Sequence, residues 1–98
     1  MGADTAALLA VLEEARAYLA RPDNDFSWSS FHDMAAALEE LDGLTAMVHA
    51  GGPVPFTLTV LFAPTGPIQE VSLSSGWGDE FLALADRFDA ALAGRPLP

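Results

Sequence analysis

Apolar residues at helical spacing predict one helix near the beginning of the chain and another near its end. In residues 4–20, and again after Asp79, apolar side chains recur at intervals of three and four, which places them on one face of a helix. Asp4 or Thr5 can cap the first helix, and Pro22 ends it because proline disfavours helical geometry in the residue before it. Gly94 ends the last helix. The two apolar stripes are Leu8, Val11, Leu12, Ala15, Tyr18 and Leu19 in the first helix, and Phe81, Leu84, Ala85, Phe88 and Leu92 in the last.

A second helix is predicted over residues 30–49, where another apolar stripe runs at helical spacing. Ser30 together with Asp33 resembles a capping box, in which side-chain oxygens accept hydrogen bonds from the first free backbone N–H groups. At the other end, Gly51 suits a left-handed cap and Pro53 prevents the helix from continuing. Two helices are therefore expected in the first half of the chain.

The middle of the chain shows the alternation that is typical of strands. From Phe56 to Phe62 the chain is rich in β-branched and aromatic residues, and every second side chain falls on one face. Residues 63–67 read APTGP, in which two prolines and a glycine predict a turn. Residues 69–74 predict a second strand. Together these segments predict an antiparallel β-hairpin.

The order helix, helix, strand, strand, helix predicts an α+β fold, in which the hairpin packs against three helices as a single domain over residues 1–98. The strand from Phe56 to Phe62 carries no charge that would protect an open edge. We therefore expect a second copy of the chain to pair with this strand, so that a homodimer extends the hairpin to a four-stranded sheet. The chain's own helices and another protein are the alternative covers.

The charge balance excludes several classes of partner. The chain has four Arg, no Lys and fourteen Asp or Glu residues, with a formal net charge of -10 at pH 7. It offers no basic patch to the phosphates of a nucleic acid, and an anionic membrane would repel it. A basic protein partner fits this charge best, through steering more than through affinity. The simpler interpretation is that the acidic surface only keeps the domain soluble.

The sequence also bears on location. Met1 is not followed by a basic region and an apolar core, so no signal peptide is expected, and no apolar run is long enough for a membrane helix. The chain is therefore expected in the cytoplasm. The absence of Cys excludes disulfides and thiolate chemistry. Abundant Ala with no Lys suggests a bacterial genome rich in G and C.

The candidate catalytic and metal-binding residues do not form a recognised site. Asp23, Asp25 and Ser27 alternate as at the start of a calcium loop, but the glycine and the final glutamate that such a loop needs are missing. His32 and His49 fall near opposite sides of a helix and cannot share a metal ion. No nucleophile stands with a base in a known motif. The sequence therefore predicts no catalytic residue, no metal and no cofactor.

Large aromatic residues in polar segments are the remaining candidates for a binding surface. Trp28 lies in a loop over residues 22–29, and Trp77 lies where the last helix begins. The simpler interpretation is that both rings pin their segments to the core, although protein interfaces also favour Trp because it buries a large area with few torsions. We expect a surface made of these two rings and their neighbours, namely Phe26, His32, Asp23, Asp25, Asp79 and Glu80.

These features lead to one functional hypothesis and two alternatives. The leading hypothesis is a non-enzymatic protein-binding module, of the adaptor, inhibitor or immunity type, that binds a basic protein. The first alternative is a small-ligand-binding protein or minor enzyme whose pocket is lined by Trp28, Trp77 and His32. The second is a subunit of a larger assembly. Convergence of the two Trp-containing segments on one concave site would favour the ligand-binding alternative.

Overall fold

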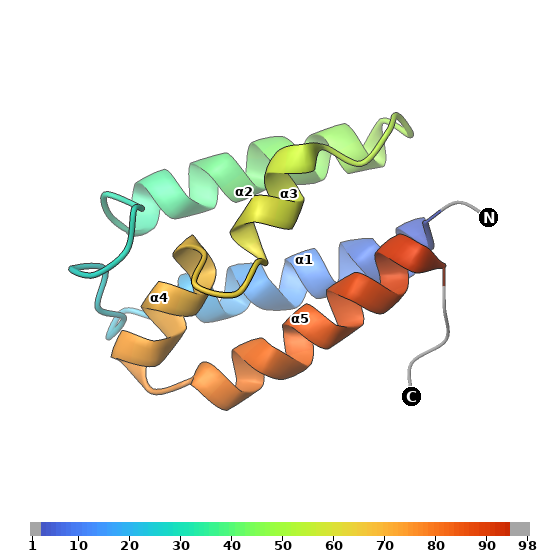
Figure 1. Cartoon of the computed structure of the whole chain (residues 1–98). Coiled ribbons are helices and arrows are strands. Elements are labelled where there is room, and N and C mark those ends of the chain that lie inside the picture. Colours follow the sequence, from blue (N-terminus) through green and yellow to red (C-terminus); the bar gives the residue numbers. More distant parts are fainter. Residues whose placement is uncertain (1–2, 95–98) are drawn as a thin grey trace.

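The computed structural model describes residues 3–94. In that range the chain forms helices joined by loops and turns (Figure 1). The helices are α1 (Thr5–Leu19), α2 (Met34–His49), α3 (Phe56–Leu61), α4 (Pro67–Ser75) and α5 (Gly78–Ala93). The prediction of an α+β fold is therefore wrong, since the described residues contain no strand. None of these helices combines the length and the hydropathy that crossing a membrane requires.

α1 is the central helix, and α2 and α5 lie along its two sides, both antiparallel to it (Figure 1). Asp4 caps α1 by accepting a hydrogen bond from the N–H of Ala7 at 3.1 Å. The N–H of Asp4 donates in turn to the carbonyl oxygen of Ala91 at 2.7 Å, which fastens the start of α1 to the end of α5. The apolar stripes of α1 and α5 meet in the core, where Leu8 and Phe88 are buried. The structure thus confirms the predicted first and last helices.

The second helix begins later than its sequence indicates. The carboxylate of Asp33 accepts a hydrogen bond from the N–H of Ala36 at 2.8 Å, so Asp33 alone caps α2. α2 therefore begins at Met34, and Ser30 belongs to the preceding loop. Gly51 follows the helix with a φ of 83°, which confirms the left-handed conformation expected at this end.

The expected first strand is helix α3, because helical spacing buries its apolar residues better. Leu58, Leu61 and Phe62 fall on one face of a helix, and all three are buried. In an alternating strand the same residues would be divided between two faces. A helix also pairs its own backbone groups, whereas an isolated two-stranded hairpin leaves many of them open and is marginally stable. Burial and backbone pairing thus outweigh the local strand preference of these residues.

The expected second strand is helix α4, so the hairpin is absent from the described residues. Pro67 occupies its first position, where a missing N–H costs nothing, and Gly76 ends it with a φ of 86°. Ile68, Val71 and Ser72 are buried, again at helical spacing. The part of the chain that the structure describes has no strand through which a second copy could extend a sheet. The expectation of a homodimer that pairs through the strand from Phe56 to Phe62 is therefore no longer supported.

A tight turn at residues 63–66 joins α3 to α4 and sets their relative direction. A Cβ on Gly66 would lie 2.6 Å from the carbonyl oxygen of Val60, so the turn has room only for glycine. Thr65 has a φ of 61°, which is uncommon for a β-branched residue. Its N–H donates to the side-chain oxygen of Gln69, which fastens the turn to the beginning of α4.

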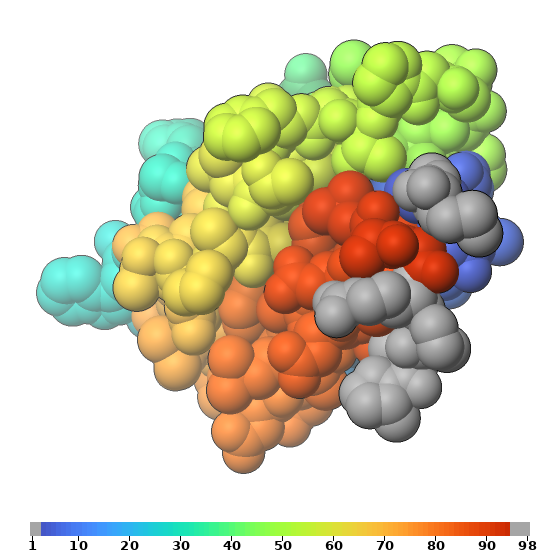
Figure 2. Space-filling view, turned by 45° about the vertical axis from the view of Figure 1, so that its right-hand side comes forward, coloured from blue at the N-terminus to red at the C-terminus, as the bar shows by residue number. Residues whose placement is uncertain are grey.

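The loop over residues 20–33, which joins α1 to α2, projects from one end of the molecule and is teal in Figure 2. Asn24 holds its first half in place. The side-chain amide of Asn24 donates to the carbonyl oxygens of Tyr18 at 2.8 Å and of Leu19 at 3.0 Å. The carbonyl of Tyr18 also accepts from the N–H of Arg21 at 3.3 Å. Asn24 therefore adds to this bond, satisfies the carbonyl of the last residue of α1 and anchors the loop.

Candidate functional site

Trp77 is a core residue. Its side chain is 1% exposed, and its ring stacks on Tyr18 with centroids 5.0 Å apart. The indole N–H donates to the side-chain oxygen of Asn24 at 2.9 Å. Trp77 therefore joins the beginning of α5 to the end of α1 and to the loop that follows it, and presents no surface to a partner.

Trp28 has the opposite environment, because its side chain is 75% exposed on the projecting loop. Phe26, two residues earlier, is half-buried and packs against the core. Asp23 is exposed in the same loop, and Asp25 is partly exposed. Hydrogen bonds from the side chain and the backbone N–H of Ser27 hold the pKa of Asp25 below its usual value. The tip of the loop is thus an exposed aromatic ring next to acidic side chains.

The two Trp-containing segments lie against each other without forming a shared pocket. The N–H of Asp25 donates to the hydroxyl oxygen of Ser75 at 2.9 Å, and the hydroxyl of Ser29 donates to the carbonyl oxygen of Pro67 at 3.0 Å. These contacts fasten the loop to α4. Because the ring of Trp77 is inside the core and the ring of Trp28 is in solvent, the two rings do not face one cavity.

The remaining residues of the expected surface lie outside the core. His32 is exposed in the loop before α2. Asp79 and Glu80 are exposed in the first turn of α5, where a negative charge interacts favourably with the helix dipole. The structure therefore divides the expected binding residues between the core, the loop and the first turn of α5.

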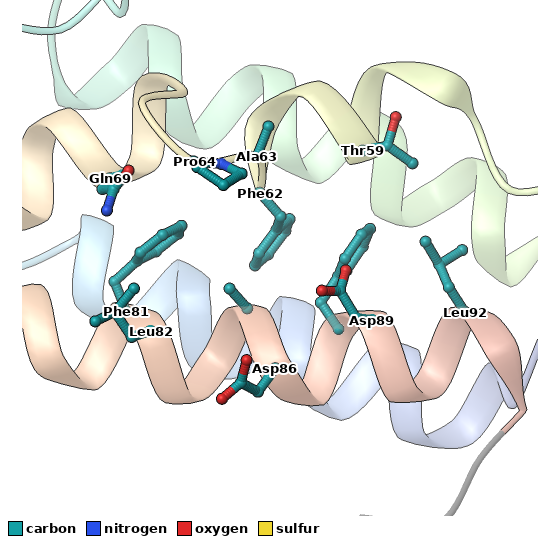
Figure 3. Close-up of a pocket in the computed structure, with 12 residues that line it drawn as sticks. Thr59, Phe62, Ala63, Pro64, Gln69, Phe81, Leu82, Asp86, Asp89 and Leu92 are labelled. Atoms are coloured by element: carbon teal, nitrogen blue, oxygen red, sulfur yellow. The ribbon is translucent and has the colours of Figure 1, made fainter.

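A hollow of about 330 Å³ lies between the α3–α4 segment and α5 (Figure 3), and we call it the α3–α5 groove. In Figure 3, Thr59, Pro64 and Gln69 belong to the upper wall and Leu92 to the lower wall. The α3 and α5 helices lie beside each other on the face that Figure 2 shows, in yellow-green and in orange to red. The full lining is Thr59, Phe62, Ala63, Pro64, Gln69, Phe81, Leu82, Ala85, Asp86, Phe88, Asp89 and Leu92.

Three stacked aromatic rings form the floor of the groove. The ring of Phe62 lies 4.4 Å from that of Phe88, with an angle of 5° between their planes, and 6.4 Å from that of Phe81. All three are buried. Phe62 follows α3 directly, and its large side chain bridges the gap to α5. The hollow is therefore a consequence of two helices that are joined through long side chains rather than through close backbone packing.

The two walls of the groove differ in charge. Asp89 points toward the hollow, and Asp86 lies on the outer side of α5 (Figure 3). The two carboxylates are one helical turn apart, so they give this wall a negative potential. The opposite wall is uncharged, with Thr59, Pro64 and Gln69.

Apolar surface continues beyond the groove onto the outer face of α3. Phe56 is 79% exposed and Val60 is 45% exposed, one turn apart on that helix. On the α5 side, Leu82 is 52% exposed. The interpretation of residues 56–62 as a strand concealed this feature, because it placed Phe56 and Val60 on the same face as Leu58. On a helical projection of the same residues, the exposed Phe56 and Val60 lie on a different face from the buried Leu58.

A second hollow, of about 410 Å³, lies between α1 and α2. Its charged groups include Arg16 and Asp42, which form an ion pair across the two helices with Nε–Oδ1 and Nη2–Oδ2 distances of 2.8 and 3.1 Å. The pairing raises the pKa of Arg16 and lowers that of Asp42. Because this guanidinium is already engaged, the second hollow has less to offer a charged ligand than the α3–α5 groove.

The described residues give no direct sign of a cofactor or a known family. Within residues 3–94, no three His, Asp or Glu side chains are grouped as metal ligands. Comparisons with protein-family models, with curated proteins and with solved structures gave no significant match. The function has to be inferred from the groove and its surroundings.

Proposed function

We propose that the protein is a non-enzymatic, cytoplasmic protein-binding module that holds a basic and partly apolar segment of another protein in the α3–α5 groove. The observation that carries the proposal is an aromatic floor with two carboxylates, of Asp86 and Asp89, on one wall only. Protein interfaces combine an apolar centre with a polar rim in this way. The position of the acids makes a basic segment the complementary partner.

The extent of the apolar surface favours a protein over a small molecule. A ligand that fills about 330 Å³ would leave Phe56 and Val60 in water, because neither lines the hollow. A partner that continues across α3 covers them as well. Exposed apolar side chains gathered on one helix are typical of protein interaction sites.

The charge of the whole chain supports the same class of partner. With a formal net charge of -10, the protein attracts a basic molecule from a distance and orients it before contact. The attraction mainly raises the association rate and falls with salt. The groove then supplies the short-range apolar contacts.

The proposal is tested by affinity purification of the tagged full-length protein from its host, at low salt, with a groove variant beside the wild type. The variant carries Leu82→Ser in the groove lining, together with Phe56→Ser and Val60→Ser on the outer face of α3. All three side chains are exposed, so these changes should alter the free energy of unfolding little. We expect a basic protein that co-purifies stoichiometrically with the wild type and is lost from the variant.

Met47→Ser is the matched control, because Met47 is 53% exposed but lies on α2 and does not line the groove. It should recover the partner as the wild type does. Equal recovery with the variant that carries Leu82→Ser, Phe56→Ser and Val60→Ser would contradict the assignment of the groove. Circular dichroism of each variant establishes that a loss of binding is not a loss of structure.

A small apolar cation is the second candidate, because about 330 Å³ falls within the range of small-molecule pockets. Such a ligand would contact the aromatic floor and Asp89 without reaching Phe56. Recovery of the protein alone, together with thermal stabilisation by small amphiphilic cations that Phe56→Ser does not reduce, would favour this candidate.

A further inference from the structure

We infer that the segment held in the groove is an amphipathic helix, which packs along α5 and places a Lys or Arg side chain against Asp89. This inference rests on the proposed function and adds the conformation and the key residue of the partner. Three features of α5 and its surroundings carry it.

The first feature is a second stripe on α5. Its core stripe consists of Phe81, Leu84, Phe88 and Ala91, which are buried. One residue further along, Leu82, Ala85, Asp89 and Leu92 line the groove at successive intervals of three, four and three. That spacing is the one by which helices pack side by side. α5 therefore presents a helix-packing seam to the groove in addition to the seam that it buries.

The length and the walls of the groove favour a helix as the occupant. From Leu82 to Leu92 the seam extends about 15 Å at 1.5 Å per residue, which matches three turns of a partner helix. An extended segment would gain main-chain hydrogen bonds only from an open strand edge, and residues 3–94 contain no strand. Against the aromatic floor, the backbone N–H and C=O groups of an extended segment would lose their hydrogen bonds to water and gain no others. A helix pairs these groups internally.

The second feature is the charged residue of the seam, whose neighbour Asp86 lies on the outer side of the helix. Asp89 is its ionisable member, between the apolar side chains of Ala85 and Leu92. A partner that covers the seam removes water from this carboxylate, and an uncompensated charge in such a place is strongly unfavourable. A single charged residue at a packing position also fixes the register of two helices.

The third feature is that the arginines of the described chain are engaged elsewhere. Arg16 pairs with Asp42 and Arg87 with Glu14. Arg21 lies over the ring of Tyr18, 4.3 Å from its centroid. Within residues 3–94, each arginine thus has another partner, and we assign the cation that compensates Asp89 to the bound segment.

The test uses the full-length ¹⁵N-labelled protein and a synthetic peptide of about 15 residues as the probe. The peptide is an amphipathic helix former with Leu at the seam spacing and one central Lys. A second peptide has Glu in place of that Lys, and a third has a central Pro that breaks the helix. Binding is measured at low salt from chemical-shift changes.

We expect the Lys peptide to bind, with shift changes concentrated in the residues of the groove. The Glu peptide should bind more weakly, by up to about fivefold for a partly solvated ion pair, and the Pro peptide more weakly still. In the Asp89→Lys variant the order of the Lys and Glu peptides should reverse. Glu39→Lys is the matched control, because Glu39 is exposed on α2 and does not line the groove, so the same charge change there should preserve the order.

Four outcomes would overturn the inference: no binding of the Lys peptide, shifts that map outside the groove, equal binding of the Pro peptide, or an unchanged order of peptides with Asp89→Lys. These are separable from a failure of the proposed function. If the peptides fail while the variant with Leu82→Ser, Phe56→Ser and Val60→Ser still loses the natural partner, the groove binds a protein but not a helix of this kind.

Discussion

Replacing Trp77 by Ala should remove a large part of the stability of this protein. The ring is buried, stacks on Tyr18 and donates a hydrogen bond to Asn24. A buried Trp takes roughly 150–250 Å² out of water, which at about 25 cal/mol per Å² corresponds to about 4–6 kcal/mol. Measured Trp→Ala changes in cores cost about 3–5 kcal/mol, and we expect this range.

That loss is large against the total. Domains of this size unfold with a free energy of about 5–15 kcal/mol, so the variant would be marginal at room temperature. The measurement is urea unfolding followed by circular dichroism, with the free energy extrapolated to water. Trp28→Ala is the matched control, because the same side chain is removed from a position that is 75% exposed, and the free energy should change by less than about 0.5 kcal/mol.

Trp77→Phe separates the ring from the hydrogen bond. It keeps an aromatic ring against Tyr18 but leaves the side-chain oxygen of Asn24 without the indole donor. We expect an intermediate cost of about 1–2 kcal/mol. If Trp77→Ala and Trp28→Ala cost the same within about 1 kcal/mol, the reasoning that makes Trp77 a central core residue is refuted.

Two further predictions concern the turn and the acid limb of stability. Gly66→Ala should destabilise the protein by about 1–3 kcal/mol in thermal unfolding, because the new Cβ would press on the backbone of α3. Gly43→Ala is the control: a Cβ there meets open space and should stabilise α2 by about 0.5–1 kcal/mol. A neutral Gly66→Ala would contradict the geometry of the turn. The hydrogen bond from Arg87 holds the pKa of Glu14 below its ordinary value of 4.5. The pair therefore stabilises the folded state above that pH, and the contribution is lost as the pH falls through the lower folded value. In urea unfolding as a function of pH, Glu14→Gln should be less stable than the wild type at neutral pH and converge with it in acid; a constant difference between the two would disprove the linkage.

The long helices could be predicted because their local signals agree with their packing. The apolar residues of α1 recur at three and four, Asp4 stands where a cap is needed, and Pro22 follows the end. Because this apolar stripe covers a wide face of the helix, the helix buries it against whichever element packs beside it. Burial against neighbours then confirms what spacing and capping already favour.

The segments α3 and α4 could not be predicted in this way. Phe56 to Phe62 alternates like a strand and is rich in residues that favour strands. The same letters also place Leu58 and Leu61 together on a helical face. Which pattern applies depends on the neighbour: with α5 close by and no other strand to complete a sheet among residues 3–94, the helix buries more apolar surface and pairs its own backbone.

The candidate site shows the same division. Trp77 and Trp28 have similar surroundings in the sequence, yet one is in the core and the other is in solvent. Local composition cannot separate them, because burial depends on whether Tyr18 and Asn24, more than fifty residues away in the chain, lie beside the ring. The groove was missed for a related reason, since its walls come from α3, α4 and α5 and exist only when these segments pack together.

The sequence by itself determined the acidic surface, the absence of Cys and Lys, and the three long amphipathic helices, because these follow from composition and from contacts within a few residues. Only the tertiary structure decided that the middle of the chain is helical, which Trp is buried, and that Phe62 bridges to α5 at the floor of a groove with acidic residues on one wall. Those outcomes depend on surfaces that distant parts of the chain bring together, and the free energy of burying them exceeds the preferences of any single segment.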